Sequence, residues 1–301
     1  MTRLSAELLF FWDYDTQWGG DRSRLPGGPK SWGVLEFANT ERLLELHAEH
    51  GVPACFAVVG SAALPGERPY HDPAQIRRVP AAGHEIGSHS HRHEWLPGLD
   101  AAALRETLTS SKDALEQCIG APVTTFVPPW NQPFDYPRGF SFSLSERREG
   151  GSHRTGLARL CETLAETGYR FCRVAYRPMH QRVAEIVARR RLDQAGRIET
   201  IRGVSCVRLN TPGGFARHTV EVLRRSTRRG GVTVVYGHPH SLTLGNSQDE
   251  RHLAPFLQLV SAMCKSGELR VVLPRDRVPA GLAGGGLGRA AREAARAVES
   301  A

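Results

Sequence analysis

Two short clusters of polar residues have the composition of a catalytic metal site. Asp13 and Asp15 stand one residue apart at the end of the apolar run 8–12, and His89 and His93 stand four residues apart. One carboxylate and two imidazoles bind a zinc-like ion and leave a position open for water, which separates a hydrolytic site from a closed structural one. The aspartate that does not bind the ion is then free to accept a proton from that water.

Each cluster also has a purely structural explanation. Acidic residues after a strand often form turns or cap helices, and a histidine-rich segment such as 87–93 can be a polar loop. Both clusters, however, directly follow short apolar segments. If those segments are parallel strands, both clusters lie at the same end of one sheet. The context therefore favours a shared site.

The elements that must position these residues alternate along the chain. Apolar or β-branched runs predict strands at residues 8–12, 54–59, 85–87, 123–127, 169–174, 204–209, 232–236 and 269–273. Amphipathic stretches predict helices at residues 37–49, 101–119, 156–167, 180–191, 216–228 and 251–265. This alternation predicts an α/β fold with a parallel sheet that closes into a barrel. Several candidate residues then fall at the carboxyl ends of strands, where barrel enzymes carry their catalytic residues. They are Asp13, Asp15, His89, residues 128–130 and His238.

Length and charge bound the remaining possibilities. The 301 residues fit one barrel domain, predicted over 1–278, followed by a flexible Gly/Ala/Arg-rich tail at 279–301. The net charge of +8 permits anionic partners, yet the arginine clusters follow apolar residues at helical spacing, which is typical of solvated helix faces. Zinc-finger spacing and mixed aromatic and basic patterns are missing from the sequence, so nucleic acid is not an expected partner.

The cysteines and the N-terminal residues predict a compartment. Six cysteines are scattered without a C-x-x-C pair, which favours reduced core residues over a disulfide framework. The N-terminal apolar run is short and leads straight into Asp13, so it reads as neither a signal peptide nor a membrane span. We expect a cytoplasmic protein without stable membrane insertion, and the sequence leaves its oligomeric state open.

Four segments resemble the motifs of a known family. Residues 83–93 (GHEIGSHSHRH) resemble the second motif of the polysaccharide deacetylases, the NodB-homology or carbohydrate esterase family 4 proteins. Asp13-Tyr14-Asp15 is similar to a spaced version of the paired first-motif aspartates. Residues 126–131 (FVPPWN) resemble the third motif, and residues 234–239 (VVYGHP) resemble the late strand that ends in a histidine. The resemblance runs from about residue 8 to about residue 275, and it implies a distorted (β/α) barrel of about seven parallel strands in a single domain.

The resemblance also implies roles for individual residues. Asp15, His89 and His93 match the metal ligands, with zinc expected and cobalt or nickel as alternatives. Asp13 matches the general base, and His238 matches the general acid that protonates the departing amine. A backbone N–H near Trp130 is expected to help hold the oxyanion. The residues expected to bind substrate are Pro129, Trp130, Asn131 and Trp18, although packing explains the tryptophans equally well.

Three departures from the family pattern concern the surroundings of the site. Val127 stands where the third motif usually begins with an arginine that orients the base. The fourth motif, an aspartate and tryptophan pair that tunes the acid histidine, is not visible. Residues 134–156 form an irregular insert that we expect to act as a lid or substrate rim. These departures put the surrounding residues and the substrate in question more than the metal, because supporting residues can come from other positions.

The leading functional hypothesis is a metal-dependent hydrolase that removes an N-acetyl group from an amino sugar. Its expected partner is an N-acetylated glycan: an oligosaccharide, a polysaccharide or a lipid-linked precursor. One alternative is a metal-dependent amidohydrolase for a non-sugar amide, which the same residues would serve. Another is a catalytically decayed carbohydrate-binding protein on the same fold, which the missing arginine favours and the intact polar set opposes.

Overall fold

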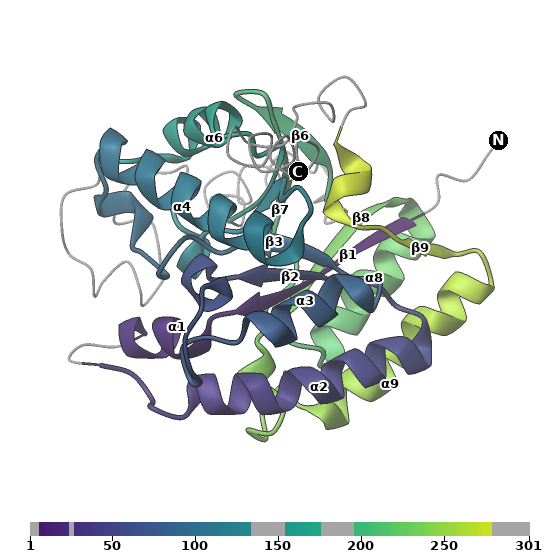
Figure 1. The fold of residues 1–301 in the computed structure, drawn as a ribbon. Coiled ribbons are helices and arrows are strands. Elements are labelled where there is room, and N and C mark those ends of the chain that lie inside the picture. The colour runs from purple at the N-terminus through teal and green to yellow at the C-terminus, as the bar shows by residue number, and fades with distance from the viewer. Residues whose placement is uncertain (1–5, 24–26, 134–153, 176–195, 279–301) are drawn as a thin grey trace, which may run out of the picture.

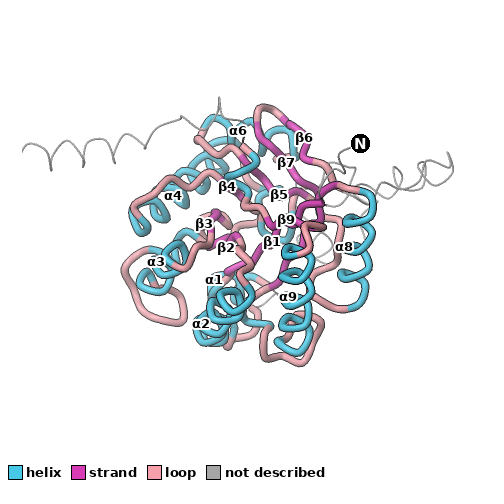
Figure 2. The backbone as a smooth tube through the Cα atoms, turned by 90° about the vertical axis from the view of Figure 1, so that its right-hand side faces the viewer, coloured by secondary structure: helices cyan, strands magenta, loops and turns pink. Residues whose placement is uncertain are grey.

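The computed structural model describes residues 6–23, 27–133, 154–175 and 196–278. Helices surround a strongly curved central sheet (Figures 1 and 2). The strand order is β6-β7-β5-β4-β3-β2-β1-β8, and β9 pairs with β1 beside β2. The strands are β1 (Ala6–Tyr14), β2 (Cys55–Val58), β3 (Glu85–Ser88), β4 (Thr125–Phe126), β5 (Phe171–Val174), β6 (Ile198–Ile201), β7 (Val204–Arg208), β8 (Gly231–Gly237) and β9 (Leu269–Val271).

The predicted α/β barrel is confirmed, with one strand that the sequence analysis missed. All described pairings are parallel except that of β6 with β7. The helices are α1 (Thr16–Arg22), α2 (Trp32–His50), α3 (Pro73–Ala81), α4 (Ala101–Ile119), α6 (Leu157–Glu166), α8 (Arg217–Arg229) and α9 (Glu250–Lys265). Among these, α1 and α3 were not predicted, and α2 begins earlier than expected. The predicted helix at 180–191, the tail at 279–301 and most of the insert at 134–156 lie outside the described residues.

The sheet is apolar on both faces, and this decides where the polar residues point. Leu9 and Phe11 of β1 belong to a small buried cluster inside the barrel, together with Val127 and Phe171. The alternate residues of β1, such as Phe10, pack in the larger cluster between sheet and helices. Side chains alternate along a strand, so Asp13 continues the inward series of β1 and Arg173 continues that of β5. Both charged residues therefore face the barrel interior.

The edge of β8 that faces away from β1 is closed mainly by contacts with loop residues. Gly196 forms an isolated antiparallel bridge with Val232. The Asn210 side chain donates to the Val232 carbonyl at 2.8 Å and accepts from the Val234 N–H at 2.9 Å, as a strand peptide would. The Thr211 hydroxyl donates to the Val234 carbonyl at 2.6 Å. The barrel is thus nearly closed, and loop side chains bridge the gap between β7 and β8.

Two sequence expectations about the whole chain can be compared with the described residues. None of the helices in the described ranges is long and apolar enough to cross a bilayer. All six cysteines are free, and four of them are buried in the core as predicted. The expected compartment stays a prediction, as does the division of the chain at residue 278.

Candidate metal centre and catalytic site

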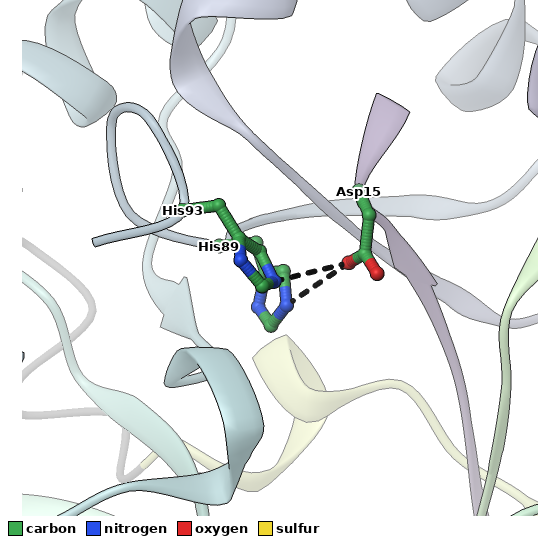
Figure 3. Close-up of side chains that lie close together, drawn as sticks. All are labelled: Asp15, His89 and His93. Carbon is green, nitrogen blue, oxygen red and sulfur yellow. Dashed lines mark ion pairs between the residues drawn. The ribbon is translucent and has the colours of Figure 1, made fainter. Parts of the chain in front are cut away.

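Asp15, His89 and His93 converge at the carboxyl ends of the central strands. Asp15 follows β1, His89 follows β3, and His93 lies in the loop beyond it (Figure 3). Asp15 Oδ1 lies 3.3 Å from His89 Nε2 and 3.5 Å from His93 Nε2. Each residue offers one ligand atom, and these atoms lie within 4.8 Å of one another. The structure therefore brings together the three predicted ligands, and all three are buried.

The chemistry of these three donors fits a divalent cation. His89 Nδ1 lies 2.7 Å from the Val127 carbonyl, which can only accept, so this nitrogen carries the proton and Nε2 keeps its lone pair for a ligand. Asp15 Oδ1 is buried without a hydrogen bond even though two imidazole nitrogens approach it. Burial alone would raise the pKa of Asp15, but the adjacent His93 and His89 lower it well below its usual value. Asp15 is thus an ionised carboxylate facing two imidazoles, as a metal ligand must be.

Helix α2 holds the turn that carries Asp15. Thr16 has a left-handed φ of 55°, and its N–H donates to Oε2 of the fully buried Glu36 at 2.8 Å. Gly33, one turn before Glu36, approaches the same turn so closely that a Cβ there would meet Gln17 N at 2.8 Å. The close packing of α2 therefore fixes the direction in which Asp15 leaves the strand.

Backbone strain is concentrated around this site. Six non-glycine residues of the described ranges have positive φ, and five of them lie in the three loops that form the site. They are Thr16, Ser90, His93, Trp130 and Asn131. Each such residue costs on the order of 1–3 kcal/mol, and such conformations persist where surrounding contacts enforce them. The strain marks these loops as the functional end of the barrel.

Asp13 forms a buried ion pair that the sequence analysis missed. Arg173 Nη1 and Nη2 donate to the two oxygens of Asp13 at 2.7 and 2.6 Å, and Nη2 also donates to Asn131 Oδ1 at 3.0 Å. Burial would raise the pKa of Asp13, but Arg173, together with His89 and His238, lowers it below its usual value. The carboxylate is therefore ionised at neutral pH and held in one orientation, as a general base requires.

Arg173 takes the place of the arginine that the third motif lacks. Phe126 of β4 pairs in register with Cys172 of β5, so the next residues along, Val127 and Arg173, are neighbours on the inner face. The arginine that orients the base is thus displaced by one strand. A sequence signal was present, because Arg173 is a lone charge inside the apolar run 169–174 and such a charge needs a buried partner.

His238 stands opposite Asp13 at the end of β8. Its Nε2 lies 3.9 Å from Asp13 Oδ2, and its side chain is 25% exposed. His240, two residues further along the chain, is buried against Trp32, with stacked ring centroids 4.0 Å apart. Its Nδ1 lies 3.6 Å from Glu36 Oε2. His238 is therefore the histidine that faces Asp13, the predicted base, and His240 is not among the residues that line the cavity.

The polar residues border a cavity of about 140 Å³. Trp130 and Asn131 line it as expected, and three lining residues were missed: Ser23, Trp32 and Tyr236. Trp130 also packs edge-on against the ligand His93, with centroids 4.3 Å apart.

Two of the residues expected to bind substrate lie elsewhere. Trp18 packs against Tyr70 and His71, and Pro129 is buried behind the cavity wall. The Asn131 N–H donates to the Pro128 carbonyl at 3.1 Å. The Asn131 N–H is therefore already engaged, and the predicted oxyanion donor must be another N–H group near Trp130. This role stays a prediction.

Comparisons with known proteins show which proteins this chain is similar to. Residues 32–135 match the family model described as polysaccharide deacetylase. A chitin deacetylase of Pestalotiopsis sp is 35% identical over 94 residues, which are 31% of this chain and 30% of that protein. The match thus spans about a third of the length of this curated relative.

Solved structures extend the likeness to most of the chain. A protein from Mycobacterium smegmatis, provisionally assigned as a polysaccharide deacetylase, superposes with a TM-score of 0.55 at 20% identity, over 88% of this chain and 86% of its own. A family 4 acetyl xylan esterase from Clostridium thermocellum, solved with a cobalt ion, has a TM-score of 0.45 at 15% identity, over 89% and 87%. The predicted resemblance to the polysaccharide deacetylases is therefore confirmed, by the family model over residues 32–135 and by a shared fold over most of the chain.

Proposed function

We propose that the protein is a zinc-dependent hydrolase that removes the acetyl group from the nitrogen of an amino sugar in a glycan. The observation that carries the proposal is the placement of a candidate base and a candidate acid beside one set of three candidate ligands. Asp13 and His238 lie 3.9 Å apart at the cavity that Asp15, His89 and His93 border. Cobalt and nickel suit the same donors.

Each step of amide hydrolysis has a residue suited to it. A divalent ion bound by the three ligands would supply a Lewis acid that activates water and polarises the acyl oxygen. Asp13, ionised and held by Arg173, accepts the proton of the attacking water. His238 Nε2 donates a proton to the leaving nitrogen, which cannot depart as an anion. The same pair then serves acetyl transfer to water without a covalent enzyme intermediate.

The walls of the cavity support a sugar as the substrate. Trp32 and Trp130 both border it, and their flat faces suit packing against a sugar ring while polar groups fix its orientation. Asn131, held by Arg173 through its Oδ1, leaves its amide nitrogen as a donor near the substrate. The name of the curated relative, chitin deacetylase, points to acetylated amino sugars as the first compounds to test.

Arg173 weakens the competing hypothesis of a decayed binding protein. That hypothesis relied on the absence of an arginine to hold the base, and Arg173 supplies this contact from β5. The alternative of a non-sugar amide is served by the same residues and becomes an outcome of the test.

Acetate release measured together with metal content tests the proposal. Purified protein, stripped with a chelator and reloaded with zinc, cobalt or nickel, is incubated with N-acetylglucosamine oligomers, acetylated polysaccharides and small non-sugar acetamides. We expect acetate from the sugars only after reloading, and none from His89→Ala, which should also lose the metal. Thr243→Ala, an exposed change on a nearby loop, is the matched control. Turnover of the non-sugar amides alone, or equal turnover by stripped protein, would contradict the proposal.

A further inference from the structure

Gln248 reaches back from the loop before α9 to contact His238 twice. Its Oε1 lies 2.7 Å from the backbone nitrogen of His238 and 3.0 Å from the ring Nδ1. The loop itself is fixed, because the Gln248 N–H donates to Asn246 Oδ1 at 2.8 Å and the next residue, Asp249, caps α9. The Gln248 side chain thus contacts both the backbone and the ring of His238, the predicted acid, from a loop of fixed conformation.

The backbone contact settles which atoms face each other. A backbone N–H can only donate, so the amide atom facing it must be the oxygen of Gln248. That oxygen cannot donate, so the Nδ1 beside it must carry a proton. Nδ1 is protonated in the imidazolium and in one neutral tautomer of His238, and the other neutral tautomer is excluded.

With Nδ1 protonated, Nε2 is the nitrogen of His238 through which a proton can be transferred. This is the nitrogen that faces Asp13 Oδ2 at 3.9 Å, on the cavity side of the ring. A general acid works only if its transferable proton sits on the atom that points at the leaving group. We propose that Gln248 is a positioning residue that fixes the orientation and tautomer of His238 so that Nε2 delivers the proton. The proposal deepens the proposed function and rests on it.

The chemistry of an amide suits this position. Three carboxylates, one cation and two rings already surround His238. They are Asp13, Asp15, Glu36, Arg173, His240 and Tyr236. Another carboxylate at position 248 would hold the imidazolium more tightly and resist release of its proton. A neutral oxygen fixes the same geometry without adding a charge.

A matched set of variants in the zinc-loaded protein tests this role. Gln248→Leu keeps the size of the side chain and removes the acceptor, whereas Gln248→Glu keeps an acceptor oxygen. We expect Gln248→Leu to retain zinc and to hydrolyse an activated aryl acetate within about threefold of the parent, while losing roughly 10²-fold on an N-acetylglucosamine oligomer. Gln248→Glu restores the acceptor oxygen but adds a charge, so it should recover only part of the amide activity. Ser247→Ala, on the neighbouring exposed residue, should leave both activities unchanged.

Nitrogen NMR of His238 gives a readout that does not depend on activity. In the parent protein, at a pH where the ring is neutral, we expect the proton on Nδ1, and in Gln248→Leu a mixture of both tautomers. A proton on Nε2 in the parent, or an equal loss of both activities in Gln248→Leu, would overturn the proposal. If the parent releases no acetate from any amide, the proposed function fails, and the tautomer measurement still decides the role of Gln248.

Discussion

Two carboxylates are buried at opposite ends of the same barrel and differ in their protonation. Asp13, at the carboxyl end of β1, is bound by both nitrogens of Arg173. Glu85, at the start of β3, accepts hydrogen bonds from the Thr125 hydroxyl and the Arg275 backbone N–H, and it forms no ion pair within the described part of the chain. Burial raises the pKa of Glu85 to about 7, whereas Arg173, with His89 and His238, lowers the pKa of Asp13 in spite of its burial.

The difference shows which kind of partner makes a buried carboxylate useful as a base. Two hydrogen bonds from uncharged donors do not offset the desolvation of Glu85, whereas a bidentate guanidinium with two nearby imidazoles offsets that of Asp13. The end of the barrel that carries the cation therefore supports proton transfer at neutral pH. The opposite end holds a carboxyl group that is partly neutral there and serves packing.

Removal of Arg173 gives the largest expected effect, because it makes Asp13 resemble Glu85. In Arg173→Met, Asp13 stays buried without its cation, so its pKa rises and its orientation is lost. We expect kcat/KM for acetate release at pH 7 to fall by roughly 10²–10⁴-fold, the scale of general-base catalysis. The free energy of unfolding in urea should fall by about 3–5 kcal/mol, as for other broken buried pairs.

A relocated arginine provides the control for this prediction. Val127→Arg combined with Arg173→Val returns the cation to the strand where the family usually carries it, opposite its present position. Partial recovery of both activity and stability relative to Arg173→Val alone is expected. No recovery of activity in a double variant that is fully stable would show that Arg173 does more than hold Asp13.

Substitution of the aspartates themselves comes next in size and separates the base from the ligand. Asp13→Asn keeps the hydrogen-bonding shape without the proton acceptor, so kcat should fall by roughly 10²-fold or more while zinc stays bound. Asp15→Ala should lose the metal. Elemental analysis of the purified variants, paired with acetate release, checks both outcomes. Equal metal loss in the two variants would contradict the assignment of Asp13 as the base and Asp15 as the ligand.

The smallest effect is expected at Glu85 and concerns stability rather than rate. Its pKa is about 7 in the folded protein against a usual 4.5, so the folded protein binds an extra proton between these pH values. The contribution of this proton to stability is complete below about pH 4.5 and is lost as the pH rises through about 7, a change of about 3 kcal/mol. Glu85→Gln should remove that pH dependence in urea unfolding at pH 5 and pH 8. Glu106→Gln, on an exposed part of α4, should leave it unchanged.

The sequence predicted the three candidate ligands that the structure brings together, and it missed the residues that support the site, for a physical reason. Asp15, His89 and His93 lie next to apolar runs whose periodicity reveals the strands, so local patterns place them at one end of the barrel. Arg173 acts on Asp13, 160 residues away, and only the strand order brings the two together. Gln248 lies ten residues beyond His238, and its contact depends on the path of the loop between them, which no periodicity reveals. Trp32 was missed because α2 begins before the amphipathic pattern does. The antiparallel β6 was missed because its side chains are largely exposed and carry no buried alternation.

The two edges of β8 differ in how their backbone groups are hydrogen-bonded. One edge pairs with β1 over seven consecutive residue pairs. The other edge is bordered by Gly196, by the side chains of Asn210 and Thr211, and by the Gly214 N–H, which donates to the Tyr236 carbonyl. The Val234 N–H on this edge is protected by a single side-chain oxygen. Amide hydrogen exchange should therefore be faster at Val234 than at the strand centres that form continuous ladders. His238, the proposed acid, thus stands at the end of a strand with one edge bordered mainly by loop residues, whereas the candidate ligands Asp15 and His89 follow β1 and β3, which pair with strands on both edges.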